Sequence, residues 1–306
     1  MRWQGVFPAV TTKFTAQDQL DIPAFTANLD AQLEAGVHGI ILGGTLGEAS
    51  TLETEEKYAL VRAAVDHVAG RVPVIMNIAE QTTKGAIAAA QRAEDNGASG
   101  LMMLPPMRYL ADDQETVAYY QSTAKATRLP IMVYNNPVDY KILVTLDMFE
   151  ALAACDNIVA VKESTRDLTN ITRMVNRFGD RFAIFSGVDT LGMESLLMGA
   201  QGWVAGLVCA FPRETVAIYE LIQAGRVAEA REIYRWFMPL LELDIHPKLV
   251  QYIKLAEQEV GLGTEQVRAP RLPLRGTERE RTLAIIRTAL TNRPDLTHIQ
   301  SPLDYA

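Results

Sequence analysis

The sequence predicts an α/β fold, a (β/α)8 TIM barrel with a C-terminal helical extension. Short apolar runs alternate eight times with amphipathic helical stretches, which is typical of a parallel sheet built from β-α-β units. A doubly wound sheet would usually carry a glycine-rich dinucleotide pattern after its first strand, and this chain has Thr11-Thr12-Lys13-Phe14 there. With 306 residues, of which 48% are hydrophobic, the chain is long enough to bury the core of one large barrel.

Eight strands are expected from runs of apolar and β-branched residues. They cover residues 6–11, 39–42, 73–77, 100–104, 130–135, 158–163, 182–186 and 202–205. Glycines that follow the intervening helical stretches indicate where a left-handed residue closes each helix. These glycines are Gly36, Gly70, Gly97, Gly179 and Gly199. Thr54 is expected to cap a helix whose first turn holds Glu55 and Glu56.

The strand pattern ends near Phe211, and the remaining sequence has the periodicity of amphipathic helices. We expect these helices at about 213–224, 226–243, 247–260 and 277–291. The chain is therefore divided into a catalytic barrel over residues 1–225 and a C-terminal helical extension over residues 226–306.

Composition excludes several classes of partner. A net charge of −8 without a basic stripe argues against nucleic acid. We find no apolar stretch of about 18 residues that would span a membrane and no signal peptide, so a cytoplasmic location is expected. Cys155 and Cys209 lack the spacing of metal ligands, and the four histidines stand singly. We expect no metal and no cofactor.

Lys162 is the first candidate for chemistry, because it directly continues the apolar run Ile158-Val159-Ala160-Val161 at the carboxyl end of a predicted barrel strand. A lysine buried there is either paired or deprotonated, and a neutral amine can form a Schiff base with a carbonyl substrate. An ion pair with Glu163 is the structural alternative. Lys13 and Lys141 also follow strands and are weaker rivals. The lysines in helical stretches are expected to be solvated: Lys57, Lys84, Lys125, Lys248 and Lys254.

Two further strand ends carry candidate residues. Tyr134 ends the strand next to that of Lys162, so its phenol is either a proton shuttle or a packed side chain with a bonded hydroxyl. The stretch Gly43-Gly44-Thr45-Leu46-Gly47-Glu48 either offers backbone amides and the Thr45 hydroxyl to a carboxylate, or forms a tight turn that needs glycine. Gly187, after the seventh strand, is a further candidate for substrate binding.

Taken together, three segments resemble the signatures of the dihydrodipicolinate synthase and N-acetylneuraminate lyase superfamily: 44–48, 134–137 and 161–163. The resemblance covers nearly the whole chain. It implies a barrel enzyme that condenses, cleaves or dehydrates 2-oxo acids through a lysine imine. Members commonly form tetramers built from dimers, so a homo-oligomer, either a dimer or a tetramer, is implied.

The resemblance also assigns roles to individual residues. It places Lys162 at the Schiff-base lysine and Tyr134 at the proton-shuttling tyrosine. Thr45 and the Leu46 amide fall on the site for the 2-oxo-acid carboxylate, and Val204 falls where a carbonyl of the eighth strand faces the lysine.

The chain departs from the synthase pattern in three places. Val138-Asp139-Tyr140 stands where a synthase has an arginine for the carboxylate of its second substrate. Leu46 replaces the second residue of a threonine pair. Met107 stands at about the place of a tyrosine that reaches into the neighbouring subunit, with Tyr109 as a nearby substitute.

Longer segments, at 5–14, 204–207, 211–219 and 233–237, are similar to the Δ1-pyrroline-4-hydroxy-2-carboxylate deaminases of bacterial hydroxyproline breakdown. This likeness implies conversion of the cyclic imino acid to 2,5-dioxopentanoate (α-ketoglutarate semialdehyde) and ammonia. The partner would then be a small 2-oxo acid or cyclic imino acid. The alternatives are a 2-keto-3-deoxy sugar acid aldolase or dehydratase, a dihydrodipicolinate synthase-like lyase, and a non-catalytic regulatory member that binds 2-oxo acids.

Overall fold

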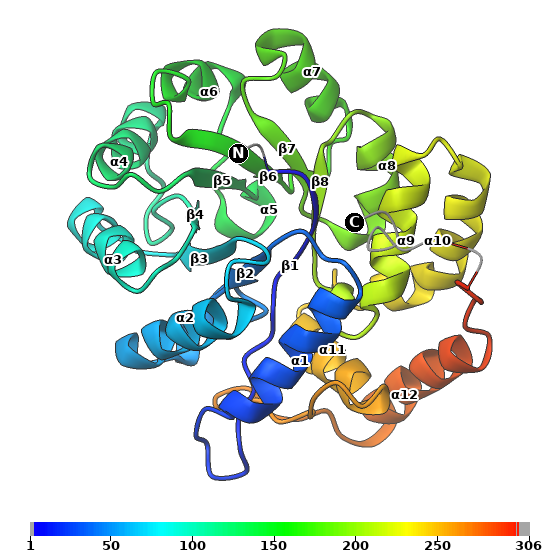
Figure 1. Ribbon diagram of the computed structural model, residues 1–306. Coiled ribbons are helices and arrows are strands. Elements are labelled where there is room, and N and C mark those ends of the chain that lie inside the picture. The colour runs from blue at the N-terminus through cyan, green and yellow to red at the C-terminus, as the bar shows by residue number, and fades with distance from the viewer. Residues whose placement is uncertain (1–2, 298, 300–306) are drawn as a thin grey trace.

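A computed structural model describes residues 3–297 and 299, and within them eight parallel strands form a barrel surrounded by helices (Figure 1). The strands lie in the order β1-β8-β7-β6-β5-β4-β3-β2. A bridge between Ala9 and Ile41, with the Val10 amide donating to the Ile41 carbonyl at 2.9 Å, joins the first strand to the second. The expected fold class is confirmed.

The strands lie close to the expected positions. They are β1 (Gly5–Pro8), β2 (Ile40–Leu42), β3 (Val74–Ile78), β4 (Gly100–Met103), β5 (Ile131–Asn135), β6 (Ile158–Glu163), β7 (Ala183–Ser186) and β8 (Gly202–Ala205). The sixth and eighth have the expected bounds. The first ends three residues early, because beyond Pro8 only the single bridge at Ala9 continues the ladder.

Helices occupy the connections and the C-terminal part of the chain. They are α1 (Ile22–Glu34), α2 (Thr54–Val68), α3 (Thr83–Asp95), α4 (Asp113–Lys125), α5 (Pro137–Tyr140), α6 (Leu146–Leu152), α7 (Thr169–Phe178), α8 (Gly192–Leu197), α9 (Pro212–Gln223), α10 (Val227–Leu241), α11 (Leu249–Glu259) and α12 (Gly276–Thr291), with the 3₁₀ turns η1 (Ala49–Thr51), η2 (Asp189–Leu191) and η3 (Leu207–Cys209). Figure 1 shows α10, α11 and α12 on one side of the barrel, next to α9 and α1. None of the described helices is long and apolar enough to cross a bilayer.

The helix ends test the local predictions. All five glycines expected to close helices have a positive φ, which confirms that interpretation. The expected cap at Thr54 is wrong by one residue. Thr54 is the first residue of α2, and Glu53 is the cap. The Glu53 amide donates to the Glu56 carboxylate at 2.9 Å, so a capping box takes the place of a threonine cap.

The side chains of the barrel form two layers. An inner cluster fills the barrel below its mouth and contains Phe7, Ile41, Ile75, Met102, Met132, Tyr134, Ala160, Phe185 and Val204. An outer cluster lies between strands and helices. Because side chains alternate along a strand, Ala160 points inward and Val161 outward. The same alternation directs Lys162 into the mouth of the barrel and Glu163 away from it.

Candidate active site

A cavity of about 490 Å³ lies at the carboxyl ends of the strands. All the residues singled out from the sequence as catalytic or substrate-binding line it: Thr45, Leu46, Tyr134, Lys162, Gly187 and Val204. Its volume suits a small organic ligand. The residues that the sequence placed on five different strand ends therefore meet in one space.

Lys162 is 8% exposed and stands next to Tyr134 in the register of β5 and β6. Its Nζ lies 4.1 Å from the centroid of the Tyr134 ring. Among the described residues, no carboxylate forms an ion pair with Lys162. Burial lowers the pKa of the Lys162 amine, and the opposing effects of Tyr140, Asp244 and Asp189 are smaller. A larger fraction of this amine is therefore neutral near pH 7 than of an ordinary lysine.

The structure does not contain the ion pair between Lys162 and Glu163. Glu163 points out of the barrel mouth, where its carboxylate accepts from the Thr165 amide at 2.8 Å. It also accepts from Asn170 Nδ2 at 2.9 Å and Asn135 Nδ2 at 3.2 Å. These neutral donors satisfy Glu163 without Lys162, so the acidic neighbour in the sequence leaves the amine without a partner.

Tyr134 is also 8% exposed, and its hydroxyl accepts from Asn136 Nδ2 at 3.3 Å. Burial raises the pKa of the Tyr134 phenol to about 12. The hydroxyl therefore keeps its proton at neutral pH and can donate it to an oxygen that develops negative charge beside Lys162.

The loop after β2 is a tight turn with glycine at Gly43, where φ is 68°. Asn77 Nδ2 donates to the Gly43 carbonyl at 2.9 Å, and Thr12 Oγ1 donates to the Gly47 carbonyl at 2.6 Å. Within the part of the chain that the structure describes, the amides of Thr45 and Leu46 have no acceptor. The loop is thus both a glycine turn and a group of free donors facing the cavity, an arrangement that suits a carboxylate.

Gly187 and Val204 shape the wall beside Lys162. A Cβ at Gly187 would lie 2.0 Å from Ser164 Oγ and 2.7 Å from Lys162 Cγ, so only glycine lets the lysine take its position. Val204 is 2% exposed and pairs with Phe7 between β8 and β1.

The two rival lysines lie outside the cavity. Lys13 is buried, and its Nζ donates to the Glu257 carboxylate at 2.7 Å. Lys141 is exposed and donates to the Val138 carbonyl at 2.8 Å. Lys13 is therefore neutralised by a partner, and Lys141 is solvated.

The expectation that Lys254 is solvated is wrong. Its side chain is fully buried and pairs with Glu48, while Nζ also donates to the Gln266 carbonyl at 2.7 Å. The Arg268 amide donates to the other oxygen of Glu48 at 3.1 Å. The periodicity of α11 places Lys254 on a helix without showing what that face meets. The pair between Lys254 and Glu48 joins α11 to the loop after β2, residues 43–48, which we call the carboxylate loop because its free amides suit a substrate carboxylate.

Several lining residues were missed, among them Tyr140, Asp244 and Arg166. Tyr140 ends the short helix α5, and its hydroxyl lies 2.7 Å from Thr45 Oγ1. Asp244 comes from the connection between α10 and α11, and burial raises its pKa well above the usual range. Arg166 stands in the turn after β6 with a φ of 65°. Tyr140 lies within a segment already noted from the sequence, and Arg166 follows the strand end of Lys162, whereas no local signal brings Asp244 to this cavity.

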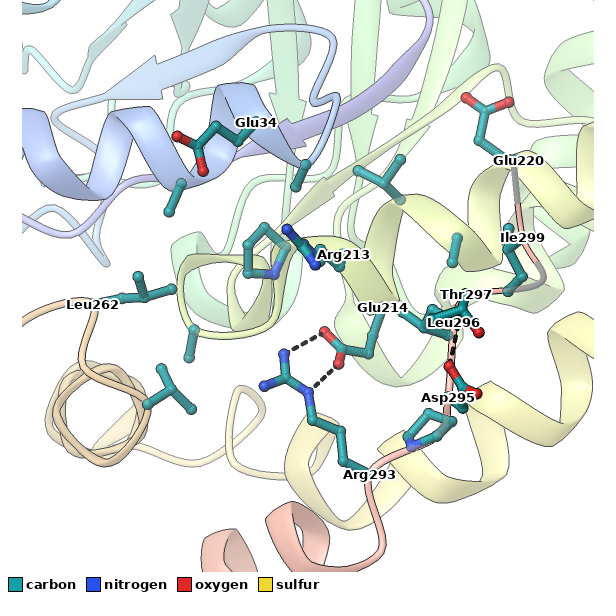
Figure 2. A pocket seen from close by; sticks show the side chains of 18 residues that line it. Glu34, Arg213, Glu214, Glu220, Leu262, Arg293, Asp295, Leu296, Thr297 and Ile299 are labelled. Carbon is teal, nitrogen blue, oxygen red and sulfur yellow. Dashed lines mark hydrogen bonds and ion pairs between the residues drawn. The ribbon is translucent and has the colours of Figure 1, made fainter. Parts of the chain in front are cut away.

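A larger cavity, of about 700 Å³, lies between α1, α9 and the segment that follows α12 (Figure 2). Arg293 pairs there with the carboxylate of Glu214, as Figure 2 shows. No lysine, tyrosine or histidine among the described residues lines this space. No group of three or more histidine, cysteine, aspartate or glutamate side chains that could hold a metal ion occurs within 3–297 and 299. Volume alone therefore does not identify the reactive site.

Comparison with known proteins is consistent with this geometry. The family described as "Dihydrodipicolinate synthetase family" matches residues 2–289. The 4-hydroxy-tetrahydrodipicolinate synthase of Exiguobacterium sibiricum is 34% identical over 89% of this chain and 92% of its own. The enzyme of that name from Pseudomonas aeruginosa is 30% identical over 87% of this chain and 91% of its own. Neither is named as a deaminase.

Two solved structures illustrate the likeness in three dimensions. The 4-hydroxy-tetrahydrodipicolinate synthase of Methylacidiphilum fumariolicum superimposes with a TM-score of 0.89 at 28% identity, over 95% of this chain and 98% of that one. A prophage protein of the dihydrodipicolinic acid synthase family from E. coli K12, solved in complex with pyruvate, has a TM-score of 0.88 at 26% identity, over 94% of this chain and 99% of that one.

Proposed function

Because the chain belongs to the dihydrodipicolinate synthetase family, we propose that it is a lyase that binds a 2-oxo acid as a Schiff base on Lys162. The observation that carries the proposal is the position of Lys162. Its amine is buried without a carboxylate partner, 4.1 Å from the ring centroid of a protonated tyrosine, in a cavity that also contains free amide donors. An amine in that setting is a nucleophile toward a carbonyl carbon.

The reaction begins when the Lys162 nitrogen attacks C2 of the 2-oxo acid. A C–N bond forms, the carbonyl π bond breaks, and the oxygen takes a proton from the Tyr134 hydroxyl. The new ammonium nitrogen returns a proton to Tyr134, which donates it to the hydroxyl that leaves as water. The resulting iminium ion accepts the electron pair released when the Tyr134 oxygen takes up a C3 proton. Thr45 and the Leu46 amide hold the carboxylate, so that C2 faces the lysine.

The names of the relatives support a synthase-type condensation, in which the enamine carbon C3 adds to the carbonyl carbon of a second substrate. Arg166 on the cavity wall adds support, because it offers a cation that could hold a second carboxylate. It takes a different position from the arginine that the synthase pattern has near Asp139.

The residues at the outer part of the cavity favour a second candidate, deamination of Δ1-pyrroline-4-hydroxy-2-carboxylate. Asp139 and Asp244 both line the cavity, and the Asp139 carboxylate disfavours a second substrate that carries a carboxylate. The cyclic imino acid has a single carboxylate, and its hydroxyl can donate to either aspartate. None of the relatives named above supports this candidate by name.

Deamination follows from the same imine. Lys162 attacks C2 of the ring, and transimination opens the ring to give a free amine on C5. Loss of a C3 proton lets the C4 hydroxyl leave as water, and isomerisation produces an imine at C5. Water hydrolyses the C5 imine to the aldehyde and ammonia, and a second water releases the 2-oxo acid from Lys162. One water is consumed overall.

The proposal is tested by reduction with borohydride in the presence of pyruvate. We expect one reduced adduct per chain, placed on Lys162 by peptide mass spectrometry. Labelling of Lys13 or Lys141 instead would refute the assignment.

Product assays then separate the candidates. If the protein converts the cyclic imino acid to ammonia and the semialdehyde, it is the deaminase. If it consumes pyruvate only when an aldehyde substrate is also present, it catalyses the condensation. Pyruvate from a 2-keto-3-deoxy sugar acid indicates an aldolase. An adduct on Lys162 with no product from any of these substrates indicates a regulatory member.

A further inference from the structure

We propose that Tyr140 is the proton-relay residue of this site and that it links Thr45 to Tyr134 within a single chain. The inference rests on the proposed imine on Lys162.

The contacts of Tyr140 carry the inference. Its hydroxyl lies 2.7 Å from Thr45 Oγ1, within hydrogen-bond distance. Its ring meets the Tyr134 ring at 79°, with 5.5 Å between the centroids. All three side chains line the cavity that holds the Lys162 amine. Tyr140 thus lies between the carboxylate loop of β2 and the tyrosine of β5.

The local sequence fixes Tyr140 in this place. Asn136 caps α5 and accepts from the Asp139 amide at 3.2 Å, and its carbonyl accepts from the Tyr140 amide at 3.0 Å. Its Nδ2 donates to the Tyr134 hydroxyl at 3.3 Å. With Pro137 restricting the first helical residue, one asparagine orients both tyrosines.

The chemistry of the hydroxyls suits a relay. Burial raises the pKa of both tyrosines, so each hydroxyl is protonated and can donate one proton while accepting another. When the Lys162 amine attacks C2, its nitrogen becomes positive and the substrate oxygen negative. One proton leaves the nitrogen and one reaches the oxygen. Tyr134 donates to the oxygen, and Tyr140, hydrogen-bonded to Thr45, accepts from the nitrogen. Return of that proton from Tyr140 to Tyr134, whose rings are in contact, leaves no net change in protons.

Tyr109 and Met107, which stand near the place of the inter-subunit tyrosine in the synthase pattern, lie in other surroundings than Tyr140. Tyr109 is 55% exposed, in the connection between β4 and α4. Met107 packs against the inner cluster, and its amide donates to Gln81 Oε1 at 3.1 Å. Within the described part of this chain, neither forms a hydrogen bond with Thr45 or Tyr134.

The test compares Tyr140→Phe with Tyr109→Phe, because each change removes one hydroxyl and keeps the ring. The readouts are the rate at which the C3 protons of pyruvate exchange with deuterium, followed by NMR, and the rate of imine trapping by borohydride. We expect Tyr140→Phe to slow both about 100-fold, with the KM for pyruvate and the melting temperature close to wild type. Tyr109→Phe is expected to stay within twofold of wild type.

The outcomes separate the two proposals. If the wild-type protein traps pyruvate and Tyr140→Phe is as fast, or if only Tyr109→Phe is slow, the relay is overturned while the imine on Lys162 stands. A rise in KM with an unchanged maximal rate would assign Tyr140 to substrate binding and also overturn the relay. If the wild-type protein traps no pyruvate, the proposed function fails and this inference fails with it.

Discussion

Two of the buried lysines, Lys162 and Lys254, are placed in different surroundings. Lys162, at the end of β6, has no carboxylate partner, whereas Lys254, in α11, pairs with Glu48 and also donates to a backbone carbonyl. Burial lowers the pKa of both amines, but in Lys254 the Glu48 carboxylate counteracts that effect most strongly. Burial alone therefore does not mark a reactive lysine. The absence of a charged partner distinguishes the site from the scaffold.

The largest effect is expected from Lys162→Met. The change removes the only amine that lines the cavity of the described site, so turnover and trapping of pyruvate should fall about a thousandfold or more. The measurement is kcat together with the mass of the borohydride-treated protein. If pyruvate were trapped on another lysine in this variant, the absence of a carboxylate partner would not identify the reactive amine.

The same variant sharpens the comparison through stability. An amine with a lowered pKa in the folded state opposes folding at every pH below the ordinary pKa of lysine, because the unfolded chain binds the proton more readily. Lys162→Met should therefore unfold in urea with an unchanged or higher midpoint at pH 7.

The matched variant Lys254→Met should lower the free energy of unfolding by about 3 kcal/mol, because it leaves the buried Glu48 carboxylate with only the more distant Arg271, at 3.7 Å, as a charge partner. Urea unfolding measures the loss. Adding Glu48→Gln should recover part of it, since the amide carries no charge. If Lys254→Met were as stable as wild type, the ion pair would not act as a structural element.

Gly187→Ala should reduce kcat by about 100-fold, because its Cβ would displace the Lys162 side chain. Steady-state kinetics measure the change. The added Cβ comes closest to Ser164 Oγ, so combination with Ser164→Ala should restore part of the rate. Full activity in Gly187→Ala would mean that the lysine tolerates a different position.

The smallest effect is expected from Asp244→Asn. When Asp244 is ionised, its charge raises the pKa of Lys162, so its removal lowers that pKa further. Burial also raises the pKa of Asp244, which favours its neutral form and keeps the effect small. Imine formation needs the neutral amine, and the acidic limb of the rate profile should therefore shift to lower pH, by less than about one unit. A shift to higher pH would contradict the sign of this interaction.

The sequence predicted the barrel and those cavity residues that stand at strand ends, because both follow from local patterns. Apolar runs mark the strands, and residues at the carboxyl ends of parallel strands meet at one mouth, which explains why Lys162 and Tyr134 were found. Lys254 was misplaced because helical periodicity does not specify the partner of a buried face. Asp244 was missed because it comes from the connection between α10 and α11, far along the chain from the strand ends. Arg166 stands three residues beyond β6 and was missed because a lone arginine in a turn has the pattern of a solvated residue.

The ion pairs of α11 bear on how far this chain can be shortened. Lys254 and Glu257 point from α11 toward the barrel, where they neutralise Glu48 and Lys13. A chain ending at the last barrel helix would leave one buried acid and one buried base there without counter-charges. The last helices therefore supply the counter-charges for two ionised groups buried against the barrel. Natural or engineered variants that lose these helices must change Glu48 and Lys13 at the same time.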